Sequence, residues 1–363
     1  MPLKSSIVNQ QSSIAMHFSQ NIIFWYLQHK RELPWRQIND PYKIWLSEVI
    51  LQQTRVAQGL PYYEKFIQEF PTVSDLAQAD EQQVLKIWQG LGYYSRARNL
   101  HHTAQYVSEN LNGKFPDNYK DLLKLKGIGS YTAAAIASFS YQEPVAVLDG
   151  NVYRVLSRYF GIETDISSSK AKKEFQDLAN EVLDKKQPSL FNQAIMEFGA
   201  LQCVPKNPDC ERCVLNDRCW ALKEKKVDKL PLKLKKTKIT ERFLHYLVFS
   251  DKENKAVIQK RKSGIWKNLY EFPFLEFDKA QSLEKVESEI RQKYTEMQIE
   301  SLCVFDEKPL VHKLSHQHLH ICFWKLKVAH SLETACEISQ LKEHPFPIVL
   351  YNFIQKTYET IKK

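Results

Sequence analysis

The stretch LLKLKGIGSYTAAAIASF, residues 122–139, decides the fold predicted for this chain. Apolar spacing predicts a first helix that runs to Lys126, a hairpin turn at Gly127-Ile128-Gly129, and an alanine-rich second helix that begins near Ser130. Two glycines let the backbone approach a ligand closely, and the free amides at the start of the second helix favour an anion such as phosphate. The stretch is equally typical of an ordinary tight turn between two helices, so by itself it leaves both interpretations open.

Four of the seven cysteines lie in CVPKNPDCERCVLNDRC, residues 203–219. The spacing C-x6-C-x2-C-x5-C lets four thiolates surround one metal centre, which suits zinc or an iron–sulfur cluster. Four unrelated buried cysteines are the alternative. The candidate metal ligands are Cys203, Cys210, Cys213 and Cys219. Interleaved basic residues allow the loop to rest on phosphate, and together with the hairpin they favour DNA as the ligand: Lys206, Arg212 and Arg218.

Length, composition and charge limit the class of protein. The chain has 363 residues, more than a usual single domain, and 43% hydrophobic and 12% aromatic residues are ample for packed cores. The formal net charge of +9 favours a polyanionic partner. The start, MPLKSSIVNQQSS, has no apolar signal segment, and no stretch approaches the roughly 20 apolar residues that cross a bilayer. With an odd number of cysteines, we expect a soluble intracellular protein with reduced thiols, cytoplasmic in a bacterium or nuclear in a eukaryote.

The residue patterns divide the chain into three parts. Residues 15–222 have apolar positions at three- and four-residue spacing and predict an all-α domain that includes the cysteine loop. Residues 223–240 are a lysine-rich link, either a solvated linker or a segment that follows a phosphate backbone. Residues 241–363 predict a smaller α+β domain. Its expected strands and closing helix are residues 242–250, 255–261, 318–328 and 346–361.

Two carboxylates have surroundings that would change their pKa. Glu48 lies in a predicted helix, four residues after Ile44 and three before Leu51, so it shares their apolar face. Burial there raises the pKa of a carboxyl and makes it a candidate proton donor, although a glutamate at the border of the core gives the same pattern. Asp149 precedes a helix that begins near Asn151, and it is either a plain N-cap or an aspartate that the helix dipole and nearby amides keep ionised. Two carboxylates shifted in opposite directions suit the cleavage of a glycosidic bond.

Three segments together resemble one family. LKGIGSYTA, VLDGNVYRVLSR and the cysteine loop have the order and spacing found in the helix-hairpin-helix DNA glycosylases that carry a [4Fe–4S] cluster, and the resemblance covers the α domain. It implies that the four cysteines hold an iron–sulfur cluster beside a basic surface that faces DNA. It also implies that the hairpin contacts the phosphate backbone through Lys126, Gly127 and Gly129. The family's hairpin usually has proline where this chain has Lys126, and a lysine there adds a cation for phosphate.

The residue at the start of the second hairpin helix separates the branches of this family. Members that also cut the strand use a lysine there to form a Schiff base. This chain has Tyr131, and a phenol forms no imine, so the chain is similar to adenine DNA glycosylases of the MutY type. That resemblance implies that Glu48 protonates a ring nitrogen of a flipped-out adenine and that ionised Asp149 stabilises or traps the oxocarbenium sugar. Tyr131 and Asn151 are expected to hold Asp149 and the sugar in place, and water activated by Glu48 completes an abasic site.

Removal of a base from the stack requires side chains that fill the gap and a pocket for the base. Matching motif positions give Gln53 of LQQT and Tyr93 of GLGYYSRARNL as the gap-filling residues. Tyr93 could instead pack in the core, although Tyr94 is the better core candidate of the pair. The expected contacts to adenine are Arg31, Trp35, Leu51 and Gln193.

SGIWKNLYEFPFLEF, residues 263–277, resembles the Nudix-like domain that adenine DNA glycosylases carry at the C-terminus. The next predicted helix, QSLEKVESEIRQKY, lacks the glutamate box with which a Nudix pyrophosphatase holds magnesium, so we expect a binding module. The resemblance implies that this module inspects 8-oxoguanine opposite the adenine, with Ser315 and His316 of HKLSHQH as reading residues. Leu314 replaces the phenylalanine or threonine that is common there.

Other residues of this part have plainer interpretations. His316, His318 and His320 alternate and share one face of a predicted strand. Metal binding is one interpretation, but without a nearby acidic or thiol partner the favoured one is a row of solvent-facing histidines. The remaining cysteines are expected to be small buried residues: Cys303, Cys322 and Cys336.

Three functions therefore compete. The first is a glycosylase that acts as a monomer on 8-oxoguanine:adenine or guanine:adenine mispairs in duplex DNA and releases adenine. The second is a related glycosylase for oxidised or mismatched pyrimidines; Tyr131 and the appended domain argue against it, although a mismatch thymine glycosylase can share the tyrosine. The third is an iron–sulfur redox sensor that binds DNA, which would have no need of Glu48 and Asp149. Motifs along nearly the whole chain favour the first.

Overall fold

The computed structural model describes residues 3–234, 238–332 and 335–358, with side chains from residue 15 onward. The chain separates into two compact units: Met1–Gln78 with Asn99–Lys236, and Ala79–Arg98 with Thr237–Lys363. The predicted linker 223–240 and closing helix 346–361 therefore lie partly outside the described residues. The predicted domain limits 15–222 and 241–363 stay predictions.

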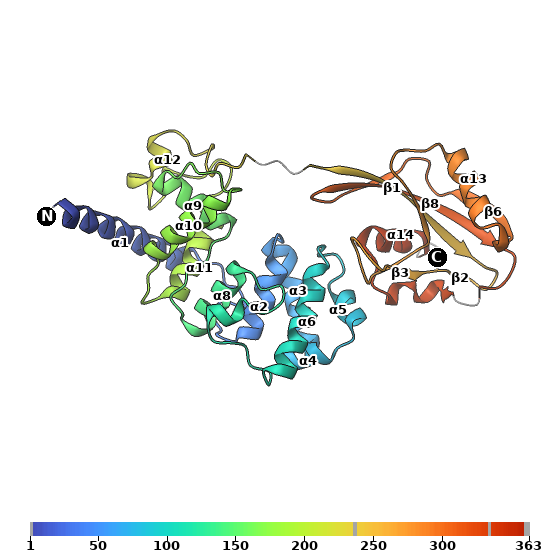
Figure 1. Cartoon of the computed structure of the whole chain (residues 1–363), viewed down its shortest axis with the longest axis horizontal. Coiled ribbons are helices and arrows are strands. Elements are labelled where there is room, and N and C mark those ends of the chain that lie inside the picture. Colours follow the sequence, from blue (N-terminus) through green and yellow to red (C-terminus); the bar gives the residue numbers. More distant parts are fainter. Residues whose placement is uncertain (1–2, 235–237, 333–334, 359–363) are drawn as a thin grey trace. The chain divides into compact units, whose positions relative to one another are not determined.

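The first unit is helical along its described length, and Figure 1 shows its helices running from blue at α1 to yellow at α12. One of them, α6, begins in the last residues of the Ala79–Arg98 segment. The elements are α1 (Leu3–His29), α2 (Pro41–Leu51), α3 (Val56–Glu69), α4 (Val73–Gln78), α6 (Ser95–Asn110), α7 (Tyr119–Leu122), α8 (Ser130–Tyr141), α9 (Gly150–Phe160), α10 (Ser169–Val182), α11 (Pro188–Leu201), the 3-10 helix η1 (Asn216–Arg218) and α12 (Trp220–Lys223).

The alanine-rich helix α8 lies in the core of this unit. It contacts α2, α7 and α11, and residues 132–139 are all buried. Alanine favours a helix and carries a short side chain, so neighbouring helices can approach a face made of alanines closely. This packing places the start of α8 beside α2 and α11, which carry Glu48 and Glu197.

The hairpin before α8 differs in one respect from its prediction. Its first helix, α7, ends at Leu122 and does not continue to Lys126. The chain then tightens through i→i+3 bonds, in which the N–H of Lys124 donates to Asp121 O and the N–H of Leu125 donates to Leu122 O, both at 3.1 Å. The hairpin turn itself forms as predicted, with Gly127 at φ +79° and α8 beginning at Ser130.

The second unit is built on a mixed sheet. Its main path has the order β6-β8-β1-β2-β9, β5 also pairs with β1, and β7 also pairs with β8; β3 and β4 form a separate pair. The long strands β1 and β8 run parallel and side by side, as Figure 1 shows. The elements are α5 (Glu81–Ile87), β1 (Thr240–Ser250), β2 (Lys255–Ala256), β3 (Gln259–Lys260), β4 (Tyr270–Glu271), β5 (Phe274–Phe277), α13 (Leu283–Lys293), η2 (Thr295–Met297), β6 (Ile299–Val304), β7 (Leu310–Lys313), β8 (Gln317–Val328), β9 (Cys336–Glu337), η3 (Ile338–Glu343) and α14 (Ile348–Tyr358).

Side chains alternate along each strand, so the sheet has apolar side chains on both faces. A helix covers each face. Leu247 of β1 packs with Val286 and Ile290 of α13 on one face. On the other face, Phe323 of β8 stacks on Phe353 of α14 with ring centroids 3.7 Å apart. The predicted strands 242–250 and 318–328 are confirmed as parts of β1 and β8, whereas 255–261 forms two short strands and not one.

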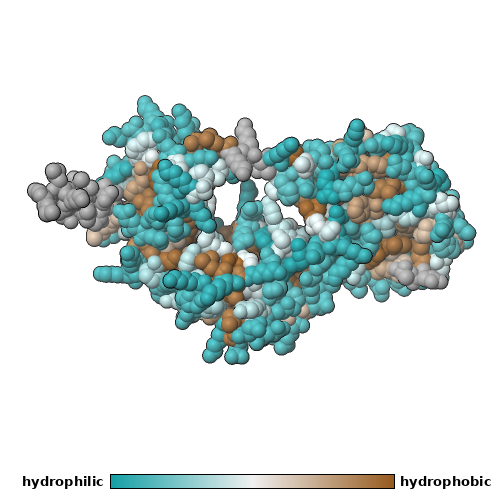
Figure 2. Space-filling model, viewed as in Figure 1, coloured by the Kyte–Doolittle hydropathy of each residue, from teal (hydrophilic) through white to brown (hydrophobic). Residues whose placement is uncertain are grey.

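The face drawn in Figure 2 is mostly hydrophilic, and its hydrophobic residues gather in small patches. Among the described helices, none is long and apolar enough to cross a membrane. Tyr93 is one of the large hydrophobic side chains that are exposed, at 46%, whereas its neighbour Tyr94 is 5% exposed. The expectation that Tyr94 is the core member of this pair is thus confirmed.

Candidate active site and nucleic-acid interface

Helices α2, α8, α9 and α11 converge on a cavity of about 540 Å³ in the first unit. Residues from the KRELPWR segment complete its wall. The structure brings eight of the predicted site residues together here: Arg31, Trp35, Glu48, Leu51, Tyr131, Asp149, Asn151 and Gln193.

Glu48 projects from α2 into this cavity and is 7% exposed. Asp40, eight residues before Glu48, caps the start of α2 by accepting from the N–H of Tyr42 at 2.9 Å and so fixes where the helix begins. Burial raises the pKa of Glu48 to about 7, and the nearby charge of Asp149 adds to the rise. The predicted direction of this pKa shift is confirmed.

Tyr131 lies at the start of α8 and donates its hydroxyl hydrogen to Oε2 of Glu48 at 2.5 Å. The hydroxyl also lies 3.3 Å from the Sδ of Met196. Burial, with Glu48 nearby, raises the pKa of Tyr131 well above its ordinary value, so the phenol keeps its proton and remains a donor. The expectation that Tyr131 holds Asp149 is therefore wrong as regards hydrogen bonding, because its partner is Glu48.

Asp149 is the N-cap of α9. Its Oδ1 accepts from the N–H of Val152 at 2.8 Å, and its Oδ2 accepts from Nδ2 of Asn151 at 2.8 Å. These bonds stabilise the ionised carboxylate, but burial in the cavity outweighs them and raises the pKa of Asp149 above its ordinary value. The expectation of a low pKa at this helix start is wrong in its net direction, since sequence position revealed the cap but not the loss of water.

A buried carboxylate that sequence reasoning missed holds two arginines of the cavity wall. Glu197 of α11 is 1% exposed and accepts from Nε of Arg31 at 2.8 Å and from Nη2 of Arg36 at 2.5 Å. Its own burial raises the pKa of Glu197, but the two guanidinium groups outweigh this and lower it to about 2. The sequence contained one indication of this role: Glu197 follows the predicted site residue Gln193 by four positions, so the two side chains share one face of the helix.

Gln193 and Trp35 are also held by neighbours. The side-chain carbonyl of Gln193 accepts from the hydroxyl of Tyr26 at 3.0 Å, and its amide nitrogen donates to Oγ of Ser189 at 3.2 Å. Trp35 is 8% exposed and meets Tyr63 edge to face, with ring centroids 5.0 Å apart. Both cavity residues are thus fixed in orientation before any ligand enters.

The remaining predicted DNA contacts lie outside the cavity. Gln53 follows the end of α2, is exposed, and has a left-handed backbone at φ +55°. Such a conformation is uncommon for a residue other than glycine and is concentrated at functional positions. In the hairpin, Lys126 is exposed, and a Cβ added at Gly129 would meet nothing within 4 Å, so this backbone is open to a ligand.

Two buried arginines tie the cysteine loop to α9. Arg158 donates to the carbonyl oxygens of residues 204–205 and lies 3.4 Å from the Sγ of Cys203. Arg154 donates to the backbone oxygen of Cys203 at 2.7 Å and to Oδ1 of Asn151 at 2.8 Å. One guanidinium group therefore connects the cysteine loop to an amide of the cavity.

The thiols of this loop fit an iron–sulfur cluster. Burial raises the pKa of Cys213 to about 12 and also raises that of Cys210 and Cys219, so thiolates here need a positively charged metal partner. The Sγ of Cys213 accepts from the N–H of Leu215 at 3.5 Å, a contact that also supports a thiolate.

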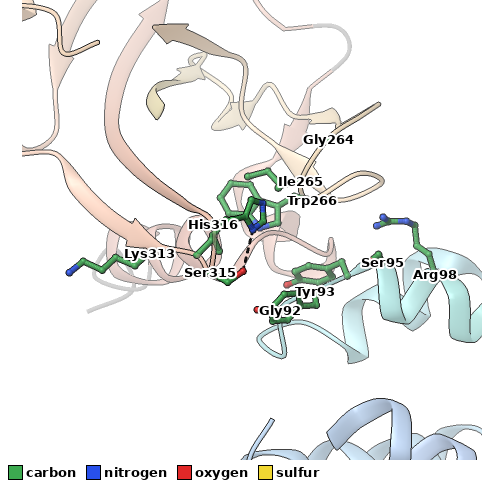
Figure 3. Close-up of a pocket in the computed structure, with 12 residues that line it drawn as sticks. Gly92, Tyr93, Ser95, Arg98, Gly264, Ile265, Trp266, Lys313, Ser315 and His316 are labelled. Atoms are coloured by element: carbon green, nitrogen blue, oxygen red, sulfur yellow. Dashed lines mark hydrogen bonds between the residues drawn. The ribbon is translucent and has the colours of Figure 1, made fainter. Parts of the chain in front are cut away.

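A second cavity, of about 410 Å³, lies in the second unit and brings Tyr93 together with Ser315 and His316. Figure 3 shows that Tyr93 comes from the Ala79–Arg98 segment, while Ser315 and His316 come from the segment between β7 and β8. Oγ of Ser315 lies 3.2 Å from Nδ1 of His316. Arg98, Trp266 and Lys313 are further lining residues, which sequence reasoning missed.

Two minor expectations for the second unit are corrected. His318 and His320 do have an acidic partner, because Glu241 on the adjacent strand β1 contacts His318 Nδ1 at 3.1 Å and His320 Nε2 at 2.6 Å. Of the three cysteines expected to be buried, Cys322 is, whereas Cys336 is half-buried and Cys303 exposed. The error about the histidines arises from pairing across strands, which the alternation within one strand does not reveal.

Family models match three parts of this chain. The model of the HhH-GPD superfamily base excision DNA repair protein matches residues 46–181, the iron–sulfur binding domain of endonuclease III matches 203–219, and a NUDIX domain matches 245–356. Among solved structures, a thermostable thymine-DNA glycosylase is 27% identical with a TM-score of 0.54, and the match covers 60% of this chain and 99% of that one. The helical part thus has the fold of a base excision DNA repair glycosylase.

Curated relatives narrow the class. An adenine DNA glycosylase of Buchnera aphidicola subsp. Schizaphis graminum is 38% identical over 84% of this chain and 86% of its own length. An adenine DNA glycosylase of Rattus norvegicus is 43% identical over 56% of this chain and 41% of its own length. The chain belongs to the family of adenine DNA glycosylases. This confirms the resemblance drawn from the sequence, the fold class, the enzyme class and the [4Fe–4S] cluster as cofactor.

Proposed function

We propose that this protein removes adenine paired with 8-oxoguanine or guanine in duplex DNA, by hydrolysis of the N-glycosidic bond and without strand cleavage. The observation that carries the proposal is Glu48, whose pKa burial raises to about 7 in a cavity shared with Asp149 and Tyr131. A carboxyl that titrates near neutral pH can give a proton to a leaving base and take one from water in the same cycle.

Tyr131 supports the acid role of Glu48. Its hydroxyl donates to Oε2, which leaves Oε1 to carry the proton that passes to a ring nitrogen of adenine. Protonation makes the base a better leaving group, and the sugar then gains oxocarbenium character. Among the described residues that line the cavity there is no lysine, so the residues present favour hydrolysis over the imine chemistry that cuts the strand.

Asp149 is proposed to stabilise the positive sugar. Its two bonds, from the N–H of Val152 and from Asn151, orient both carboxylate oxygens and support the ionised form. A fixed negative charge in a cavity with little water stabilises an oxocarbenium ion more strongly than it would in bulk solvent. Water activated by ionised Glu48 then completes the abasic site.

The adenine contacts are proposed for Arg31, Trp35, Leu51 and Gln193, all of which line the cavity. The base reaches them only after it leaves the stack, and Gln53 is proposed to fill the gap. Its exposure and left-handed backbone place its side chain on the surface and out of the core.

The protein is proposed to act as a monomer and to bind the phosphate backbone of duplex DNA. The proposed phosphate contacts are Lys126, Gly127 and Gly129: Lys126 offers a cation, and the backbone at Gly129 is open at the start of α8. The chain also carries a net charge of +9. The proposed ligands of the [4Fe–4S] cluster, which would fix the conformation of the loop when bound, are Cys203, Cys210, Cys213 and Cys219.

The base opposite the adenine is proposed to be read in the second cavity. Tyr93, predicted from the sequence to fill the gap left by the adenine, lines this cavity and is proposed to stack its exposed ring on the opposite base. Ser315 and His316 offer polar atoms to the edge of that base. An 8-oxoguanine differs from guanine by an oxygen at C8 and an N–H at N7, both of which a serine hydroxyl can contact.

The test is single-turnover base release from end-labelled duplexes that contain 8-oxoguanine:adenine, guanine:adenine, guanine:thymine or thymine glycol:adenine, each read with and without alkali. We expect cleavage at the adenine that depends on alkali and is fastest opposite 8-oxoguanine. Release of a pyrimidine would move the protein to the other branch of the superfamily. Tight binding without release from any duplex would favour a sensor.

A further inference from the structure

The loop of residues 264–269, here called the clamp loop, has an unusual backbone. Gly264, Trp266 and Asn268 have φ values of +72°, +63° and +68°. Only the glycine adopts this region freely, and a tryptophan there is an outlier of the kind found at ligand clamps and functional sites. The N–H of Asn268 donates to Arg261 O at 2.8 Å and so holds the loop in this shape.

The clamp loop grips both ends of the segment Ala79–Arg98. Nδ2 of Asn268 donates to Oε1 of Glu81 at 2.6 Å, and Nε2 of Gln82 donates to the backbone oxygen of Asn268 at 3.2 Å. At the other end of the segment, Nη1 of Arg98 donates to the backbone oxygen of Lys267 at 2.9 Å. Two adjacent residues of one loop thus hold positions 81–82 and 98.

The middle of the segment is attached separately. Lys86 donates to the backbone oxygens of Lys342 and His344, the latter at 3.3 Å, and its ammonium lies 4.6 Å from the ring centre of Tyr351. The side-chain oxygen of Gln89 accepts from the N–H of Phe346 at 3.2 Å. Helix α5 is therefore fixed along its length, within the same compact unit as the reading residues Ser315 and His316.

Tyr93 lies in the same segment as these attachments. The loop before it is closed by a bond from Nε1 of Trp88 to Gly92 O at 3.0 Å, and Tyr93 itself has φ +47°. It lines the second cavity together with Trp266 of the clamp loop and with Ser315 (Figure 3). Its ring is exposed, so packing alone does not hold it there.

We infer that Asn268 is a positioning residue for the choice between 8-oxoguanine and guanine: through Glu81 it holds the segment that carries Tyr93 against Ser315 and His316. The inference rests on the proposed function. Asn268 itself is not among the residues that line the cavity. Asn268 affects the choice between 8-oxoguanine and guanine because one base must contact Tyr93 with its face and Ser315 and His316 with its edge at the same time. Both contacts form only when these two walls of the cavity are held at a fixed separation.

The test variant replaces the side-chain amide of Asn268, which donates a hydrogen bond to Glu81, by a carboxylate, which can only accept one. Asn268→Asp keeps a side chain that tolerates the left-handed backbone but sets a carboxylate against Glu81. Glu81→Gln in the same chain restores a donor and acceptor pair with the direction reversed, and Glu81→Gln alone keeps the original acceptor. The matched control is Asn254→Asp, the same chemical change at another asparagine of this unit with positive φ, +58°, which is exposed.

Two readouts are measured on the full-length protein with its cluster. They are the ratio of single-turnover adenine release from 8-oxoguanine:adenine over guanine:adenine, and amide hydrogen exchange of residues 81–94. We expect Asn268→Asp to lower the ratio about tenfold, the effect of one lost charge-assisted hydrogen bond, and to speed exchange in this segment. The double variant should restore both, and Asn254→Asp should change neither.

Faster exchange with an unchanged ratio would overturn the role in discrimination, and unchanged exchange would show that the clamp does not hold the segment. If the double variant keeps the lowered ratio and the faster exchange, the effect of Asn268→Asp is general destabilisation and not the loss of its bond to Glu81. A wild-type protein without preference for 8-oxoguanine would overturn the proposed function and with it the role of Asn268. Exchange would still report whether the clamp exists, so the two failures are distinguishable.

Discussion

Glu48 and its hydrogen bond from Tyr131 are the residue-scale feature on which the proposed chemistry depends. Replacement by glutamine keeps the acceptor for Tyr131 and the shape of the side chain but removes the titrating proton. We therefore expect Glu48→Gln to slow adenine release by a factor of about 10²–10⁴, the usual contribution of a general acid, while duplex binding is retained. Single-turnover release and a binding titration measure the two quantities. Wild-type-like release would remove Glu48 from the mechanism.

A matched control for this variant is Glu64→Gln, the same change at an exposed glutamate of α3. It should leave both release and binding unchanged. Loss of release in both variants would point to a general effect of the substitution.

The raised pKa of Glu48 also predicts how stability depends on pH. The carboxyl titrates at about 7 in the folded protein against 4.5 when unperturbed, so its neutral form is favoured by folding and this contribution is lost as the pH rises through about 7. The burial of the charge then costs about 3 kcal/mol at 1.36 kcal/mol per pKa unit. Glu48→Gln lacks this cost. Denaturant unfolding should show a gain for the variant that is larger at about pH 8 than at about pH 5; an equal gain at both would contradict the shifted pKa.

Glu197 has a structural role at the same scale. It is 1% exposed and compensates two arginines, Arg31 and Arg36, so its removal leaves uncompensated charge in the cavity wall. We expect Glu197→Ala to lower the free energy of unfolding by roughly 3–5 kcal/mol in urea. The exposed pair Lys30–Glu32 offers the control, because Glu32→Ala should cost less than about 1 kcal/mol. Equal losses would mean that burial does not decide the effect.

At the scale of elements, the hairpin between α7 and α8 contains two glycines whose surroundings differ: the first is required by the turn, and the second is open to a phosphate. Gly127 has φ +79°, and a Cβ there would lie 2.7 Å from the Cβ of Asn99. Gly129 has φ −89° and open space around it. Gly127→Ala should therefore destabilise the protein by more than about 1–2 kcal/mol, the cost of the left-handed backbone alone.

Gly129→Ala is the matched variant of the same element. It should change stability by less than about 0.5 kcal/mol and yet weaken binding to an undamaged duplex, because the added methyl group blocks the approach of a phosphate. Unfolding curves and duplex binding are compared for both variants. Unchanged binding in Gly129→Ala would remove this glycine from the proposed phosphate contact.

At the scale of the whole molecule, the iron–sulfur loop is expected to depend on its cofactor. Burial raises the pKa of Cys213, so this thiol becomes a thiolate only with a positive partner. Cys213→Ser should lower the bound iron and the visible absorption of the cluster, and it should weaken duplex binding. Cys303→Ser, at an exposed cysteine, should keep the iron content of the wild type. Full iron in Cys213→Ser would exclude this residue as a ligand.

The sequence by itself determined the features that depend on near neighbours in the chain. The spacing of Ile44, Glu48 and Leu51 predicted a buried carboxyl on α2, and Asp149 before a helix predicted an N-cap; both are present. The cysteine spacing predicted a metal centre of zinc or an iron–sulfur cluster, and the family resemblance of the hairpin and cysteine motifs implied the [4Fe–4S] cluster and the fold class. Such features follow from the period of a helix or from contacts within a few residues, which a linear pattern contains.

Only the tertiary structure decided which distant groups meet. The partner of Tyr131 is Glu48, two arginines share Glu197, and Asn268 bonds Glu81 across 187 residues of the chain. Even Asp149, whose cap was predicted correctly, has its pKa raised because elements far away in sequence exclude water around it. Burial and pairing are set by the packing of whole helices and strands, and a single sequence holds no local pattern that records them.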